Sequence, residues 1–211
     1  MSIFQEISQN LQQGKAKNVK ALVQQALDEG ASPKDILEKG LLDGMNVIGE
    51  KFKNNEVYVP DVLIAARAMN SGVEVLKPHL VASGVKAKGT VIIGTVKGDL
   101  HDIGKNLVKM MMEGKGLEVI DLGVDVPAEK FLTAAKEHNA QIVACSALLT
   151  TTMSEMENIV AAAKEQGIRD SIKIMVGGAP VTDNYCKKIG ADYYTPDAAS
   201  AADVALSICE G

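Results

Sequence analysis

Apolar side chains recur at three- and four-residue spacing through the first 80 residues, which is the period of amphipathic helices. The stripes begin near Ile3, Val19, Ile36 and Val62. Pro60 stands at the start of the last stripe, and we expect Pro78 to end that helix, because proline interrupts intrahelical hydrogen bonding. Short turns between four helices predict an antiparallel bundle over residues 1–80.

The pattern changes after residue 88, where short runs rich in β-branched residues alternate with helical stretches. Strands are predicted over 90–95, 117–122, 141–146, 172–176 and 192–194. Helices are predicted over 104–113, 128–138, 153–166, 182–189 and 198–209. This alternation predicts an α/β domain over 89–211, with a flavodoxin-like, doubly wound, five-stranded parallel sheet. Residues 81–88, which include Ser83-Gly84, are predicted to be a linker and a hinge between the all-α domain and this one.

Composition excludes several classes of protein. The chain carries 22 lysine and arginine residues against 27 aspartate and glutamate residues, and aromatic residues make up 3% of it. This acidic balance argues against a positive groove and so against nucleic acid as the main partner, with a local basic patch left open, and the scarcity of aromatic residues argues against base-stacking platforms. No secretory leader or membrane-spanning run is visible, and three widely spaced cysteines suit a reducing compartment, so we expect a cytoplasmic protein without a membrane partner.

The loop after the first predicted strand carries the chemistry, because ligands of doubly wound sheets bind beyond the carboxyl ends of the strands. Asp99 precedes His101 by two residues, so its carboxylate can hold one ring nitrogen while the other faces a ligand. Gly104, at the start of the next helix, permits close approach of a bulky group. A locally packed His101 remains an alternative, whereas a dinuclear hydrolase needs more histidines than the three present.

Two later strand ends favour a slot beside this histidine. Ser146 places a small hydroxyl side chain at the end of the third predicted strand, and Gly177-Gly178 follow the fourth. Adjacent glycines leave a strand edge open to a ligand that approaches closely.

The spacing of these residues resembles a known signature. Asp99-x-His101-x-x-Gly104, 41 residues, Ser146-x-Leu148, 28 residues and then Gly177-Gly178 resemble the B12-binding signature of methionine synthase and its relatives. Residues 43–45, 47–49, 56–60 and 66–69 resemble the four-helix cap of that family. The resemblance covers nearly the whole chain and is greatest to the stand-alone corrinoid proteins that serve methylamine, methanol and methoxy-aromatic (O-demethylase) methyltransferases.

The resemblance implies a cobalamin or related corrinoid, bound base-off with His101 as the lower axial ligand of cobalt. Asp99 would hold His101, and Ser146 would extend this relay by a further hydrogen bond. Further contacts with the cofactor are implied for Asp102, Ile103, Gly104, Leu148, Thr150, Gly177, Gly178, Pro196 and Asp197. Tyr58 and Met69 would cover the upper face, with ordinary bundle core as the rival interpretation for Met69 and Val62. Methionine synthase has phenylalanine where this chain has Tyr58.

The function implied is that of a methyl carrier in one-carbon metabolism, which is not an enzyme on its own. It would accept a methyl group on cobalt from a substrate-specific methyltransferase and pass it to a second methyltransferase, which serves tetrahydrofolate or a thiol. A reductive activase would be a further partner. The donor stays open. Alternatives are a B12-dependent sensor or regulatory module, the B12-binding subunit of a radical mutase, and a flavodoxin-like response domain, which needs acidic residues where Lys97 stands.

Overall fold

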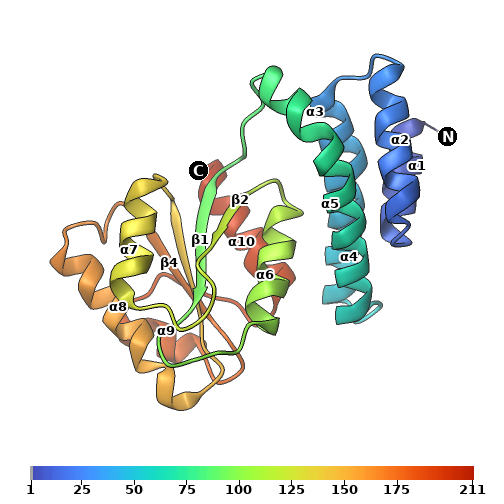
Figure 1. The fold of residues 1–211 in the computed structure, drawn as a ribbon. Helices are drawn as coiled ribbons and strands as arrows, with labels where there is room; N and C mark the ends of the chain where they lie inside the picture. Colours follow the sequence, from blue (N-terminus) through green and yellow to red (C-terminus); the bar gives the residue numbers. More distant parts are fainter. Residues whose placement is uncertain (1) are drawn as a thin grey trace. The chain divides into compact units, whose positions relative to one another are not determined.

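The computed structural model describes residues 2–211, which form two compact units (Figure 1). The first comprises residues up to 87 together with 114–116, and the second comprises residues 88–113 and 117–211. Each unit has its own core of buried apolar side chains. Among residues 2–211, no helix combines the length and the apolar character that crossing a membrane requires.

The first unit is a bundle of the four predicted helices. Its elements are α1 (Ile3–Gln12), α2 (Ala16–Asp28), a continuous run of α3 (Pro33–Asp35), η1 (Ile36–Leu42) and α4 (Asp43–Lys53), and α5 (Val59–Ala82). Residues of the apolar stripes are buried where the helices pack together, among them Ile7, Val19, Leu41 and Leu76. Periodicity alone therefore predicted both the helices and the faces that they bury.

One helix end was predicted wrongly. The α5 helix does not end at Pro78 but continues to Ala82, so the first two residues of the predicted linker are helical. Proline removes a single backbone donor, and the turn that follows it is closed by Ser83, whose N–H donates to the carbonyl of His79 at 2.9 Å. The Ser83 hydroxyl donates to the same carbonyl at 2.6 Å, which caps the last turn.

The second unit is a parallel α/β domain, as predicted. Its strands are β1 (Thr90–Thr95), β2 (Glu118–Asp121), β3 (Ile142–Ser146), β4 (Lys173–Gly177) and β5 (Tyr193–Tyr194), in the order β2-β1-β3-β4-β5. The helices are α6 (Ile103–Glu113), α7 (Ala128–Glu137), α8 (Ser154–Glu165), α9 (Asp183–Ile189) and α10 (Ala198–Glu210), with a short 3₁₀ turn, η2 (Thr150–Thr152). All these strands pair in parallel.

Two helical layers cover this sheet. The α6 and α10 helices pack together on one face, and α7 and α8 pack together on the other (Figure 1). The β1 and β3 strands are buried along nearly their whole length, which explains their continuous apolar sequences. The strand order reverses between β1 and β3, so the loops that follow these two strands diverge and leave room for a ligand at the carboxyl edge.

Candidate functional site

The strand register brings three of the predicted strand ends into one row. Thr95 of β1 pairs with Ser146 of β3, and Ser146 pairs with Gly177 of β4. The loop that carries Asp99 and His101 begins directly after this row. The candidate site therefore lies at the carboxyl edge of the sheet, at its topological switch point.

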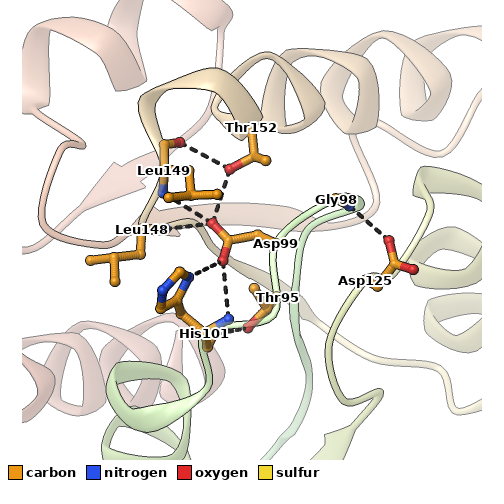
Figure 2. A network of polar contacts seen from close by, with 8 residues as sticks. All are labelled: Thr95, Gly98, Asp99, His101, Asp125, Leu148, Leu149 and Thr152. Carbon is orange, nitrogen blue, oxygen red and sulfur yellow. Dashed lines mark hydrogen bonds and ion pairs between the residues drawn. The ribbon is translucent and has the colours of Figure 1, made fainter.

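Asp99 is the centre of a hydrogen-bond network that joins the loops after β1 and β3 (Figure 2). Its Oδ1 atom accepts from the peptide N–H of His101 at 3.0 Å and lies 2.7 Å from the Nδ1 atom of the same residue. Its Oδ2 atom accepts from the peptide N–H groups of Leu148 at 2.8 Å and Leu149 at 3.0 Å, and from Thr152 Oγ1 at 2.9 Å. The carboxylate is fully buried, yet donors surround it.

These donors determine the charge of Asp99. Burial by itself would raise the pKa of this carboxyl group, but hydrogen bonds from the peptide groups of His101, Leu149 and Leu148 and from the His101 ring hold its pKa well below the ordinary value. An ionised carboxylate only accepts hydrogen bonds, so the Nδ1 atom of His101 carries a proton toward it. In the neutral imidazole, the Nε2 atom then keeps a free lone pair.

His101 is therefore arranged as a metal ligand. Its side chain is 52% exposed while the Asp99 side chain is 0% exposed. The ring therefore lies at the surface of the protein, and the buried carboxylate fixes its orientation. Carboxylate–histidine pairs of this kind fix the tautomer of a ligating histidine and raise its basicity. The Thr95 hydroxyl donates to the carbonyl of His101 at 2.8 Å and anchors the main chain of the same residue.

The expected role of Ser146 in this relay needs correction. In the part of the chain that the structure describes, Thr152 and not Ser146 donates its hydroxyl group to Asp99. The chain turns back after β3 at residues 147–149, which carries Thr152 under the carboxylate and leaves Ser146 at the strand end. Ser146 instead lines the adjacent cavity.

A cavity of about 370 Å³ opens beside the His101 loop, between the sheet, α6 and α10. Six of the predicted cofactor-contact residues line it: Gly104, Ser146, Gly177, Gly178, Pro196 and Asp197. Sequence reasoning missed other parts of the wall, which include Met112, Met175 and Ala201. These residues have the apolar periodicity of ordinary core, and only the folded sheet brings them around one space.

The glycines of the cavity have distinct reasons to be glycine. A Cβ atom at Gly104 or Gly177 would meet no other atom within 4 Å, so both positions face open space. A Cβ atom at Gly178 would lie 1.9 Å from the carbonyl oxygen of Ala147, and its φ of +128° also favours glycine. The first two keep space free, whereas Gly178 permits a close approach between two backbones.

Other predicted contacts lie outside the cavity lining. Asp102 precedes α6, where its carbonyl accepts from the Asn106 N–H at 2.8 Å. Ile103 is 77% exposed and Leu148 is 44% exposed, and Thr150 begins η2. Leu100 and Leu149 are also exposed, so exposed apolar side chains stand next to His101 in the chain and on the two residues whose amides donate to Asp99.

The residues of the helical unit that were considered for the cofactor are either exposed or buried in the bundle core. Tyr58 precedes α5 and is 66% exposed, and its peptide N–H donates to Asp61 Oδ2 at 2.8 Å. Met69 is 2% exposed and Val62 is fully buried. The expectation that Met69 covers a cofactor is therefore corrected, because its position on the inner face of α5 makes it part of the bundle core.

Comparisons with known proteins agree on one family. A family described as "B12 binding domain" matches residues 89–206, and a second family of the same description matches residues 3–77. Trimethylamine corrinoid protein 1 of Methanosarcina acetivorans is 47% identical over 189 residues, which cover 89% of this chain and 86% of the relative. The dimethylamine corrinoid protein of Methanosarcina barkeri is 43% identical over 201 residues, covering 94% of this chain and 93% of the relative.

A solved structure shows the same architecture. The crystal structure of the methanol:cobalamin methyltransferase complex MtaBC from Methanosarcina barkeri contains a chain that matches with a TM-score of 0.90 and 32% sequence identity. The match covers 99% of this chain and 80% of that one. Both the helical unit and the parallel sheet thus have counterparts in a single solved chain.

Proposed function

Because the chain belongs to the family of B12-binding proteins, we propose that it carries methyl groups on a bound corrinoid between two methyltransferases. The protein binds cobalamin or a related corrinoid. When bound, a corrinoid supplies a cobalt centre that takes up a methyl group from a donor and releases it to an acceptor. The protein supplies the binding site, the axial ligand and the electrostatic surroundings of that centre.

The observation that carries the proposal is the pairing of an ionised, fully buried Asp99 with an exposed His101. This pairing leaves the Nε2 atom of His101 free, and this atom would hold the cobalt of a bound corrinoid as its axial ligand. A single imidazole suits a metal whose other positions are filled by a macrocycle, and imidazole is a suitable donor for cobalt. Hydrogen bonds from His101 and from the amides of Leu149 and Leu148 lower the pKa of Asp99 and keep it ionised, and Thr152 helps to hold the carboxylate in place.

The space beside His101 fits the rest of the cofactor. A corrinoid bound base-off has a displaced nucleotide tail, and the cavity of about 370 Å³ that begins at Gly104 is available for it. Open space over Gly104 and Gly177 is what such a tail requires. We assign Ser146, Gly178, Pro196 and Asp197, which line the same cavity, as further contacts of the tail.

The exposed apolar side chains of Leu100, Ile103, Leu148 and Leu149 would lie against the corrin ring and exclude water from its lower side. Asp102 and Thr150, next to these residues in the chain, are proposed contacts of the ring's polar substituents. Tyr58 stays a candidate contact for the upper side because it is exposed on the helical unit.

We propose a methylamine methyltransferase system as the setting. The relatives named for trimethylamine and dimethylamine are 47% and 43% identical to this chain, against 32% for the structure of the methanol system. The protein would act with a separate methyltransferase for each transfer and with a reductive activase, and would not be an enzyme on its own. Tetrahydrofolate or a thiol is the proposed class of final acceptor.

The test uses the purified chain loaded with hydroxocobalamin and reduced to the cobalt(I) form. Purified trimethylamine, dimethylamine and methanol methyltransferases are added separately, each with its substrate, and methylation is followed by the visible spectrum. We expect methylation with one of the two amine enzymes. Methylation with the methanol enzyme alone would reassign the donor, and failure with all three, in a chain that binds the corrinoid, would contradict the methyl-carrier proposal.

A further inference from the structure

The loop that carries His101 is held from two sides (Figure 2). On one side, the loop after β3 donates its amides and the Thr152 hydroxyl to the Asp99 carboxylate. On the other side lies the loop between β2 and α7, which includes Asp125. The first set of contacts acts on the Asp99 carboxylate, whereas the second acts on the main chain around it.

Asp125 makes two hydrogen bonds to consecutive residues of the His101 loop. Its Oδ1 atom accepts from the peptide N–H of Gly98 at 2.7 Å. Its own peptide N–H donates to the carbonyl of Asp99 at 3.0 Å. A carboxylate acceptor makes a peptide hydrogen bond stronger than a neutral acceptor does. The main chain on both sides of the Gly98–Asp99 peptide is thus attached to one residue.

The neighbouring contacts extend this attachment to the end of β1. The N–H of Val126 donates to the carbonyl of Thr95 at 3.0 Å, and Val96 and Val126 form an isolated parallel bridge. The N–H of Thr95 donates to the carbonyl of Gly123 at 2.9 Å. Since Thr95 also holds the carbonyl of His101, the loop after β2 supports the main chain on both sides of the metal-ligand segment.

The backbone of Asp125 adds a second indication. Its φ is +54°, in the left-handed region that non-glycine residues rarely occupy. Aspartate and asparagine tolerate this region better than other residues, and unusual backbone conformations persist where the surrounding structure requires them. The sequence alone does not connect Asp125 with the site, because no spacing rule links it with a loop 26 residues earlier.

We propose that Asp125 is a positioning residue for the cobalt ligand. It holds the Gly98–Asp99 segment so that the Asp99 carboxylate and the His101 imidazole stand in their binding arrangement before the corrinoid arrives. A histidine that is already held in the binding orientation loses less conformational entropy when it binds the metal than a mobile histidine does. The inference rests on the proposed function where it concerns corrinoid binding. The hydrogen bonds between Asp125 and the His101 loop are present without the corrinoid.

Three variants test this role. Asp125→Ala removes the acceptor for Gly98, whereas Asp125→Asn keeps an Oδ1 acceptor and tolerates the same backbone conformation. Asn139→Ala is the matched control, because Asn139 has a φ of +50° in the same unit but precedes β3, at the opposite edge of the sheet. Each folded variant is compared with the unchanged chain, first without and then with hydroxocobalamin.

Without corrinoid, amide hydrogen exchange and the ¹⁵N signals of the imidazoles are measured by NMR. We expect the Gly98 amide of Asp125→Ala to exchange about tenfold faster, since its acceptor is lost, and the His101 Nδ1–H signal to weaken. With corrinoid, we expect the affinity of Asp125→Ala for hydroxocobalamin to fall by about tenfold and the His-ligated fraction of its spectrum to fall. Asn139→Ala should retain the properties of the unchanged chain, and Asp125→Asn should lie between the unchanged chain and Asp125→Ala, because it keeps an acceptor without the charge.

The proposal is overturned if the His101 signals and the corrinoid spectrum of Asp125→Ala match those of the unchanged chain. It is overturned equally if Asn139→Ala shows the same losses, or if Asp125→Ala fails to fold beside a folded control, because Asp125 would then serve folding in general. If the unchanged chain takes up no corrinoid, the proposed function fails, and the NMR measurements alone decide whether Asp125 holds the loop.

Discussion

A carboxylate withdrawn from water is tolerated only where hydrogen-bond donors replace its hydration. Asp99 meets this condition with donors from two loops, and the same donors set the tautomer of His101. The pairing of Asp99 with His101 could be predicted from their spacing of two residues. The identity of the third member could not, because the hydroxyl that reaches Asp99 depends on how the chain turns after β3.

Thr152 gives a prediction at this scale. Thr152→Val removes the hydroxyl at nearly constant volume and leaves one fewer donor for a buried charge, so we expect a loss of about 1.5–3 kcal/mol in the free energy of unfolding. Thr152→Ser should lose less, since it keeps the donor. Urea unfolding measures both, and Thr151→Val, at an exposed neighbouring position, is the control. Equal stabilities for the two valine variants would refute the role of Thr152.

At the scale of elements, the pattern of apolar residues predicted strand and helix ends of the α/β unit to within one residue. The prediction failed at Pro78, because the cost of a proline depends on how the following turn is capped. It also failed to identify other parts of the cavity wall. Met112, Met175 and Ala201 come from three separate elements, and local periodicity cannot distinguish a core residue from a residue that borders a space.

The contact between α6 and β2 makes a pH-dependent contribution to stability. Lys105 is 3% exposed, and its Nζ atom lies 2.5 Å from Asp121 Oδ1. Burial alone would raise the pKa of Asp121, but its hydrogen bond with Lys105, together with the Gly123 N–H, lowers it from the ordinary 3.8. A carboxyl group with a lowered folded-state pKa stabilises the fold fully above 3.8, and this contribution is lost as the pH falls through the folded-state value.

Asp121→Asn should therefore destabilise the protein by about 3–5 kcal/mol at pH 7, because it leaves the Lys105 ammonium buried without its partner charge. The difference from the unchanged chain should shrink as the pH falls below 3.8. Urea unfolding across the pH range measures this. Asp170→Asn, at an exposed position of the same unit, is the control and should have little effect. A difference that stays constant down to acid pH would contradict the assignment.

A side chain added inside the cavity should weaken corrinoid binding without preventing folding. Gly177→Val adds a side chain that points into open space, and valine suits a strand, so we expect folding to be preserved. Affinity for hydroxocobalamin should fall at least about tenfold, because the side chain occupies the space needed by the tail. Lys173→Val, at the exposed start of the same strand, is the control. Unchanged affinity in Gly177→Val would remove the cavity from the proposed site.

At the scale of the whole molecule, sequence and structure agree on a helical unit followed by a parallel α/β unit. The chain has an acidic net charge and few aromatic residues, and in the proposed role its chemistry would reside in the cofactor. Each unit folds around its own core, and we propose that residues 83–88 act as the hinge between them. We propose that the protein holds its cobalt through a single histidine, His101.

The most direct test is electron paramagnetic resonance of the protein loaded with corrinoid in the cobalt(II) form. Histidine labelled with ¹⁵N is introduced into the unchanged chain, into His101→Ala and into His138→Ala, in which the altered histidine follows α7. We predict that labelling changes the axial nitrogen splitting in the unchanged chain and in His138→Ala, and has no effect in His101→Ala. The assignment of His101 as the cobalt ligand would be contradicted if the label leaves the splitting of the unchanged chain the same, or if it alters the splitting of His101→Ala.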